Sequence, residues 1–120
     1  MSETDLMHQI LRHIGHQPDV LVMRNNVAQV LRLALLKELC PSCLAASKRH
    51  RMVCGAGVGS PDLIGSVAGK SLYLEVKQSK GVISADQKLW HAAAEARGTH
   101  VYIVRSVGDA KDAVEEVRGK

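Results

Sequence analysis

The sequence predicts an α/β protein in which a mixed sheet is flanked by helices. Two observations support this fold class. Four stretches place apolar residues at helical spacing, and four shorter ones have the composition and spacing of strands. The predicted order is helix, strand, helix, strand, strand, helix, strand, helix, as in a mixed sheet with helices on its faces. With 120 residues, the chain has the length of one domain, residues 1–120.

The N-terminal part is predicted to contain two helices and one strand. Ser2 can cap the first helix, which ends at Gly15 and has four apolar residues at i, i+3, i+4 and i+7: Met7, Ile10, Leu11 and Ile14. Residues 20–24 form a short buried strand. A second helix is predicted over 27–39, before Pro41, with an apolar face of Val27, Val30, Leu31, Ala34 and Leu35.

The remaining elements follow an irregular, basic segment over residues 40–59. Residues 62–67 and 71–76 are predicted to be strands joined by a turn. Ser84 then begins a helix that ends at Gly98. A strand over 99–104 precedes the last helix, whose apolar face contains Ala110, Ala113, Val114 and Val117.

Composition limits the classes of function. The net charge is +4 and aromatic residues make up 2% of the chain, with a pI near 9.2. A polyanionic partner fits this charge, whereas a protein that stacks successive single-stranded bases on aromatic rings does not. An odd number of cysteines, the absence of a signal peptide and the lack of a long apolar run predict a cytoplasmic protein with no membrane span.

The charged residues of the predicted hairpin form a candidate catalytic centre. Side chains alternate faces along a strand, so Glu75 and Lys77 share one face. The other face enters the core through Leu72, Leu74 and Val76. Hairpin pairing would bring Asp62 close to Glu75 at the open end of the two strands.

This pattern predicts a metal-assisted phosphodiester hydrolase. Two neighbouring carboxylates raise each other's pKa, and a divalent cation such as Mg²⁺ or Mn²⁺ removes that conflict. Lys77 then supplies a positive charge near the attacking water and the phosphorane oxygen. The alternative is an ordinary hairpin with two surface acids and a solvated lysine.

Further short motifs surround these residues along nearly the whole chain. In order they are Glu3, Arg24–Asn26, Gly57–Gly65, Leu74–Lys77, Gly81, Ser84, Gln87, Trp90 and Val104–Ser106. Together they resemble the virus-type replication-repair nuclease (VRR-NUC) family of the PD-(D/E)XK nucleases.

The resemblance implies a restriction-endonuclease-like core and a role for each matching residue. It implies a divalent metal held by Asp62, Glu75 and the backbone carbonyl of Val76, with Lys77 assisting the water. It also implies that Glu3 and Gln87 complete the catalytic site, Glu3 as a further metal ligand. Stand-alone members look like dimeric enzymes that act on branched DNA such as four-way junctions, and a phage or prophage origin is inferred from the same resemblance.

Two of these residues have structural alternatives. Glu3 can instead be an acid favoured by the helix dipole, and Gln87 can complete a capping box with Ser84.

Arg24 is a candidate for phosphate binding, and so are four residues of basic segments: Lys48, Arg49, Arg51 and Lys80. Asn25 and Asn26 can bind phosphate or cap the predicted second helix.

The segment between Cys40 and Cys54 departs from the family. Four of its residues are candidate zinc ligands, although their spacing matches no standard finger: Cys40, Cys43, His50 and Cys54. Leu33 and Leu36 fall on the polar face of the predicted second helix, where they predict a homodimer interface.

Three functions compete at this point. A structure-specific endonuclease acting on branched DNA explains the most residues. A sequence-specific or general DNA nuclease with the same core would use the same acids and lysine. A zinc-stabilised DNA-binding module without catalysis would need neither the two acids nor the lysine.

Overall fold

The computed structural model describes residues 2–25, 28–31, 51–54 and 57–120. They belong to two compact units. One comprises Met1–Asn25 and Gly59–Lys120, and the other comprises Asn26–Val58. A single domain over residues 1–120 stays a prediction. No helix in the described ranges has the length and apolar character needed to cross a bilayer.

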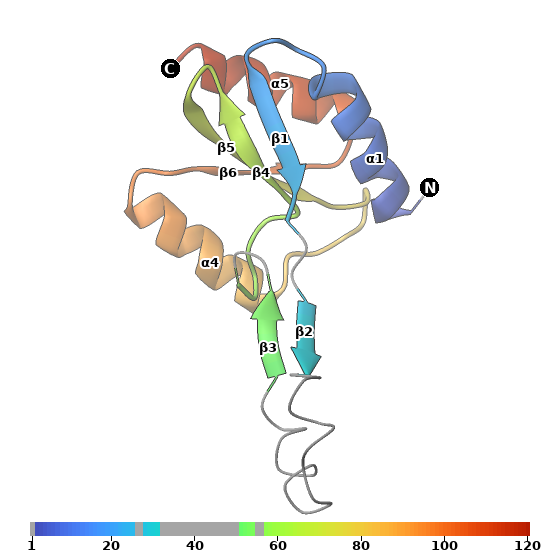
Figure 1. Ribbon diagram of the computed structural model, residues 1–120, viewed down its shortest axis with the longest axis vertical. Coiled ribbons are helices and arrows are strands. Elements are labelled where there is room, and N and C mark those ends of the chain that lie inside the picture. Colours follow the sequence, from blue (N-terminus) through green and yellow to red (C-terminus); the bar gives the residue numbers. More distant parts are fainter. Residues whose placement is uncertain (1, 26–27, 32–50, 55–56) are drawn as a thin grey trace, which may run out of the picture. The chain divides into compact units, whose positions relative to one another are not determined.

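The larger unit is built on a four-stranded mixed sheet in the order β1-β4-β5-β6 (Figure 1). Its strands are β1 (Val20–Arg24), β4 (Leu63–Val67), β5 (Lys70–Val76) and β6 (Val101–Val104). The first three pair antiparallel, and β5 pairs with β6 in parallel. The predicted α/β class with a mixed sheet is therefore confirmed.

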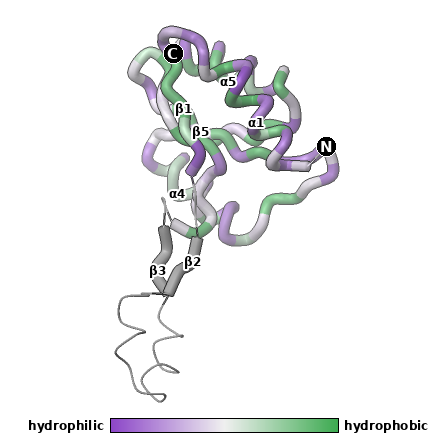
Figure 2. Tube along the Cα trace, turned by 45° about the vertical axis from the view of Figure 1, so that its right-hand side comes forward, coloured by the Kyte–Doolittle hydropathy of each residue, from purple (hydrophilic) through white to green (hydrophobic). Residues whose placement is uncertain are grey.

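Helices α1 (Glu3–Ile14) and α5 (Val107–Arg118) pack on one face of this sheet and lie against each other (Figure 1). Both alternate between hydrophilic and hydrophobic residues along their length (Figure 2). The core that they cover contains, among others, Ile10, Ile14, Leu63, Leu72, Leu74 and Val114. Ser2 begins α1 with a capping box to Asp5, as predicted.

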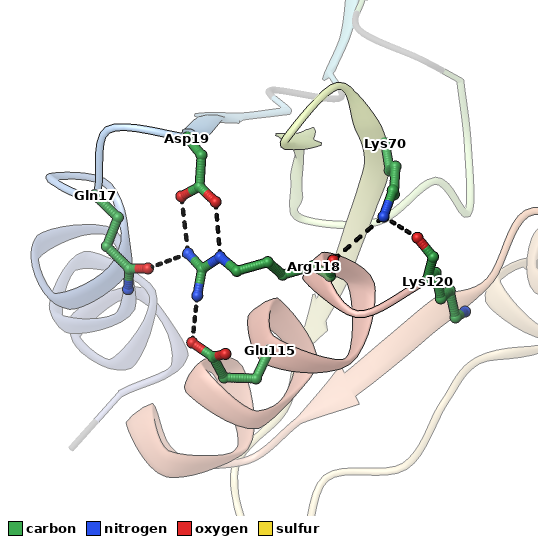
Figure 3. A network of polar contacts seen from close by, with 6 residues as sticks. All are labelled: Gln17, Asp19, Lys70, Glu115, Arg118 and Lys120. Carbon is green, nitrogen blue, oxygen red and sulfur yellow. Dashed lines mark hydrogen bonds and ion pairs between the residues drawn. The ribbon is translucent and has the colours of Figure 1, made fainter.

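Arg118 fixes the end of α5 to the connection between α1 and β1 (Figure 3). Its guanidinium donates two hydrogen bonds to Asp19, at 2.7 and 2.8 Å, and one to Gln17 at 2.6 Å. Glu115 accepts a further bond from Arg118. The hydrogen bonds from Arg118 lower the pKa of Asp19. Such bidentate pairing is geometrically specific, so the network sets the position of the C-terminal helix.

Helix α4 (Ala85–Ala96) lies on the other face of the sheet, against Tyr73 and Glu75 of β5. Ala94 is the buried residue of α4, and Leu89 is 71% exposed. The Trp90 ring meets the Tyr73 ring edge to face, with centroids 5.7 Å apart. This aromatic contact packs α4 against β5.

Two elements predicted from the sequence differ from those found in the smaller unit. Residues 28–31, expected in a helix, form strand β2 (Ala28–Leu31), and residues 51–54, expected in an irregular segment, form β3 (Arg51–Cys54). The strands pair antiparallel, with Ala28 opposite Cys54. Local helical periodicity over 27–39 could not reveal a partner strand 20 residues away, because strand pairing is non-local. Residues 32–39 lie outside the described residues.

Candidate active site

Strand β5 presents Glu75 on the face opposite the α1–α5 core. Its neighbours Leu74 and Val76 are buried in that core, as the alternation of side chains requires. Glu75 is only 1% exposed, although it faces α4 instead of the core. A carboxyl group buried to this extent needs hydrogen-bond or cationic partners.

Asp62 lies beside Glu75 because β4 and β5 pair as a hairpin. Leu63 is opposite Leu74, which places the residue before β4 next to the end of β5. The backbone N–H of Val76 donates a hydrogen bond of 2.9 Å to Asp62 Oδ2. The structure therefore brings the two predicted acids together, as the hairpin argument expects.

Asn25 holds the segment that leads into Asp62. Its side-chain amide donates to Ser60 Oγ at 2.7 Å and to the Pro61 carbonyl at 2.9 Å. Its backbone N–H donates to the Asp62 carbonyl at 2.8 Å. Asn25 thus ties the end of β1 to residues 60–62, a role that the two sequence-based alternatives for it did not include.

Gly59 allows this segment to touch the start of α4. Its φ is +85°, in the left-handed region that glycine tolerates best. A Cβ at this position would lie 2.3 Å from the Asp86 carbonyl oxygen. The absence of a side chain is therefore what lets the Asp62 segment and the Gln87 turn of α4 approach each other.

Gln87 makes contacts that correspond to both alternatives left open by the sequence. Its Oε1 accepts the Ser84 N–H at 2.8 Å and completes the capping box of α4. Its Nε2 donates to Glu75 Oε1 at 2.7 Å. The two roles are compatible because the amide oxygen serves the helix end while the amide nitrogen serves the site.

Burial raises the pKa of Glu75 to about 8, and the hydrogen-bonding and charge effects of Asp62 add to this rise. The positive charge of Lys77 acts in the opposite direction, and the negative charge of Glu3 adds a further small increase. Glu75 is therefore an acid that its surroundings leave short of positive charge.

The second carboxylate oxygen of Glu75 faces His91, one turn after Gln87 on α4. Glu75 Oε2 and His91 Nε2 are 3.7 Å apart. Both atoms are buried and have no hydrogen-bond partner. The pKa of His91 is lowered, chiefly by burial. No sequence motif marks His91, although its i+4 spacing from Gln87 places both residues on one helix face.

The residues at this site fit a divalent cation. A buried pair of carboxyl groups with one unpaired oxygen is an oxygen-rich site lacking positive charge. Among the described residues, no group of three His, Cys, Asp or Glu side chains could hold a metal. Mg²⁺ commonly uses one or two carboxylates and takes its other ligands from water and substrate phosphate. Asp62 and Glu75 match that requirement.

Lys77 and Glu3 lie at the edges of the site. Lys77 follows β5 directly, is half-buried, and donates its backbone N–H to the Val104 carbonyl at 3.0 Å. Glu3 is exposed in the first turn of α1. Its side chain therefore does not point into the apolar core, and its effect on the pKa of Glu75 is its recorded link to the centre.

A basic pocket adjoins the loop that follows Lys77. Arg105 donates through Nη1 to the Gln78 and Gly81 carbonyls, at 2.7 and 2.9 Å, and so shapes this loop. Arg105 and Lys80 line an open pocket of about 480 Å³ with Ser2, Leu6, Gln78 and Ser79. Lys80 was a predicted phosphate contact. Arg105 was not, although it stands in the quoted Val104–Ser106 motif.

The other predicted contacts are placed only in part. Arg24 is exposed at the end of β1. Arg51 and Cys54 belong to β3, but their side chains are not described. The remaining phosphate, zinc and interface predictions lie outside the described residues: Asn26, Lys48, Arg49, Cys40, Cys43, His50, Leu33 and Leu36.

Comparison with protein-family models identifies the family of this chain. The VRR-NUC domain model matches residues 2–108, which include every residue of the centre described above. A comparison with curated protein sequences gives no match. The mixed sheet flanked by helices is consistent with a restriction-endonuclease-like nuclease core. The chain belongs to the VRR-NUC domain family of nucleases.

Proposed function

We propose that this protein is a Mg²⁺-dependent endonuclease that hydrolyses phosphodiester bonds in branched DNA. The observation that carries the proposal is the pair Asp62 and Glu75. Asp62 accepts a hydrogen bond from the Val76 N–H, and Glu75 is buried with its pKa raised to about 8. An oxygen-rich, charge-deficient pair beside a lysine suits a hard divalent cation and a phosphate.

Each residue of the centre has a distinct task in this proposal. Asp62 and Glu75 would hold the cation, with the Val76 carbonyl as a further ligand, and Glu3 would contribute its negative charge from the edge of the site. When bound, Mg²⁺ or Mn²⁺ would polarise the phosphate and lower the pKa of a water. Lys77, whose charge already acts on Glu75, would orient that water and stabilise the charge that develops on the phosphate oxygens.

Cleavage assays on different DNA structures test this proposal. The protein, with Mg²⁺, is incubated with duplex, flap and four-way-junction DNA of one sequence. We expect preferential cutting of branched substrates, with a loss of at least about 100-fold in Asp62→Asn and Lys77→Met. Equal cutting of all three would support a general nuclease. No Mg²⁺- or Mn²⁺-dependent cutting, or an unchanged rate in Asp62→Asn, would overturn the assignment.

In this proposal, exposed cationic side chains bind DNA through its phosphates. Arg24, Lys80 and Arg105 are exposed cations of the described residues near the ends of the strands that carry the site. Phosphate contacts make affinity fall with salt, with a log–log slope of about −0.9 per contact. We expect Lys80→Gln to make this slope less steep by about one contact. A salt-independent affinity would mean that DNA is not the partner.

We also propose that the protein acts as a homodimer. A four-way junction offers two equivalent strands, and a two-fold enzyme presents two centres to them. One chain contributes one Asp62–Glu75 pair, so paired incision requires a second copy. Sedimentation at micromolar concentration, with and without junction DNA, tests this. A protein that stays monomeric in both conditions would contradict the proposed dimer. The proposed nuclease activity would not be affected by that result.

A further inference from the structure

We propose that His91 is a positioning residue for cation binding, because it faces the Glu75 oxygen that Gln87 does not reach. The inference rests on the proposed function, since it concerns the same carboxylate. It goes further by assigning a task to a residue that lies outside the acid–acid–lysine set.

The geometry of α4 places Gln87 and His91 together on one face. They are four residues apart, so their side chains stand one above the other. Gln87 Nε2 reaches Glu75 Oε1 at 2.7 Å. His91 Nε2 faces Glu75 Oε2 at 3.7 Å. One face of α4 therefore places an amide against one Glu75 oxygen and an imidazole opposite the other.

The two facing atoms, Glu75 Oε2 and His91 Nε2, are buried and lack hydrogen-bond partners. This supports a hydrogen bond between His91 and Glu75 that forms when a cation binds. Unpaired buried polar atoms are rare and costly, and here a donor-capable nitrogen faces an acceptor-capable oxygen. Shortening their separation by roughly 0.5–1 Å would reach ordinary hydrogen-bond length.

An ionised Glu75 would make this bond favourable. Cation binding requires the carboxylate form, which accepts hydrogen bonds through both oxygens. A His91 imidazole with a proton on Nε2 is a donor aimed at Glu75 Oε2. With Gln87 on Oε1 and His91 on Oε2, the carboxylate keeps one orientation toward the cation.

Titration of the DNA-free protein with Mn²⁺ in a calorimeter tests the inference. His91→Leu removes the donor at similar volume, and His91→Gln keeps a donor at a similar distance from the backbone. His100→Leu, at an exposed histidine, is the matched control. We expect His91→Leu to weaken Mn²⁺ binding about 10-fold or more. His91→Gln should recover most of the affinity, and His100→Leu should leave it unchanged.

Thermal unfolding without metal separates positioning from simple packing. A packing role predicts a lower Tm for metal-free His91→Leu, whereas a positioning role predicts an unchanged or higher Tm, because a buried unpaired atom is removed. If His91→Leu does not fold, His91→Phe repeats the titration with a ring that has no nitrogen. Native Mn²⁺ affinity in His91→Leu or His91→Phe would overturn the inference and leave the proposed nuclease standing. A native protein that binds no Mn²⁺ would overturn both.

Discussion

Gln87 connects the first turn of α4 to the buried carboxylate of Glu75. One end of its amide accepts the Ser84 N–H at 2.8 Å, and the other donates to Glu75 Oε1 at 2.7 Å. The start of the helix and the orientation of the acid are therefore fixed by a single side chain. This coupling places the stability of the helix end and the geometry of the site under the control of one residue.

Substitutions at Gln87 and Ser84 separate these two tasks. Ser84→Ala removes the hydroxyl that caps the Gln87 N–H and should cost about 1 kcal/mol of stability, with little loss of Mn²⁺ affinity. Gln87→Ala removes the contact to Glu75 as well, and we expect Mn²⁺ affinity to fall about 10-fold or more. Urea unfolding and calorimetric titration of both variants provide the comparison. Equal metal affinities in the two would show that the Gln87–Glu75 bond is irrelevant to the cation.

The raised pKa of Glu75 predicts a pH dependence of stability. An acid with a folded-state pKa of about 8 and an ordinary value of 4.5 keeps its proton longer in the folded protein. The folded state then binds more protons than the unfolded state between these values, so metal-free stability falls as pH rises from about 4.5 to 8. His91, with a lowered pKa, contributes the opposite slope at and below its ordinary value of 6.5.

The difference between wild type and Glu75→Gln isolates the Glu75 effect. We expect the Tm of the metal-free wild type to fall relative to that of Glu75→Gln as pH increases through this window. Adding Mg²⁺ at pH 8.5 should raise the Tm of the wild type and leave Glu75→Gln unchanged, because the cation stabilises the ionised carboxylate. Parallel Tm curves for the two proteins between pH 5 and 8.5 would contradict a raised pKa for Glu75.

The sequence was sufficient for those parts of the site that depend on local periodicity. Strand alternation predicted that Glu75 points away from Leu74 and Val76, and the hairpin turn predicted its proximity to Asp62. Both follow from neighbours along the chain. The first helix, its Ser2 cap and the four strands of the larger sheet are likewise local features, and the structure confirms them.

The contacts that the sequence did not predict all join distant segments. Asn25 was expected to cap a helix or to bind phosphate, but it binds Ser60 and Pro61. His91 faces Glu75 because α4 packs on the sheet, through contacts such as Tyr73–Trp90 and Gln87–Glu75. The helix predicted over residues 27–39 is wrong at residues 28–31 for the same reason, since pairing with residues 51–54 makes them a strand. Periodicity contains no information about such partners.

Asn25 should control the rate of cleavage more than the affinity for DNA. Asn25→Ala removes two hydrogen bonds to residues 60–61 and frees the segment that places Asp62. We expect kcat to fall about 10-fold or more, because a small displacement of a catalytic group is costly. The adjacent Arg24→Gln, which changes an exposed cation, should instead raise KM and leave kcat close to native. The reverse pattern in steady-state kinetics would mean that Asn25 contacts DNA and Arg24 orders the site.

Gly59 provides a steric test of how the site is assembled. Alanine there combines a strained positive φ with a Cβ 2.3 Å from the Asp86 carbonyl oxygen, so the Asp62 segment and α4 must separate. Gly98→Ala is a matched control, since its φ is +82° but nothing lies within 4 Å of its Cβ. Backbone strain alone costs about 1 kcal/mol, and both variants should lose that much stability. Only Gly59→Ala should also lose Mn²⁺ affinity and cleavage, because it moves the Gln87 turn relative to Asp62 and Glu75. Equal losses of metal affinity in the two variants would show that strain, and not the close approach of Gly59 to α4, accounts for the effect.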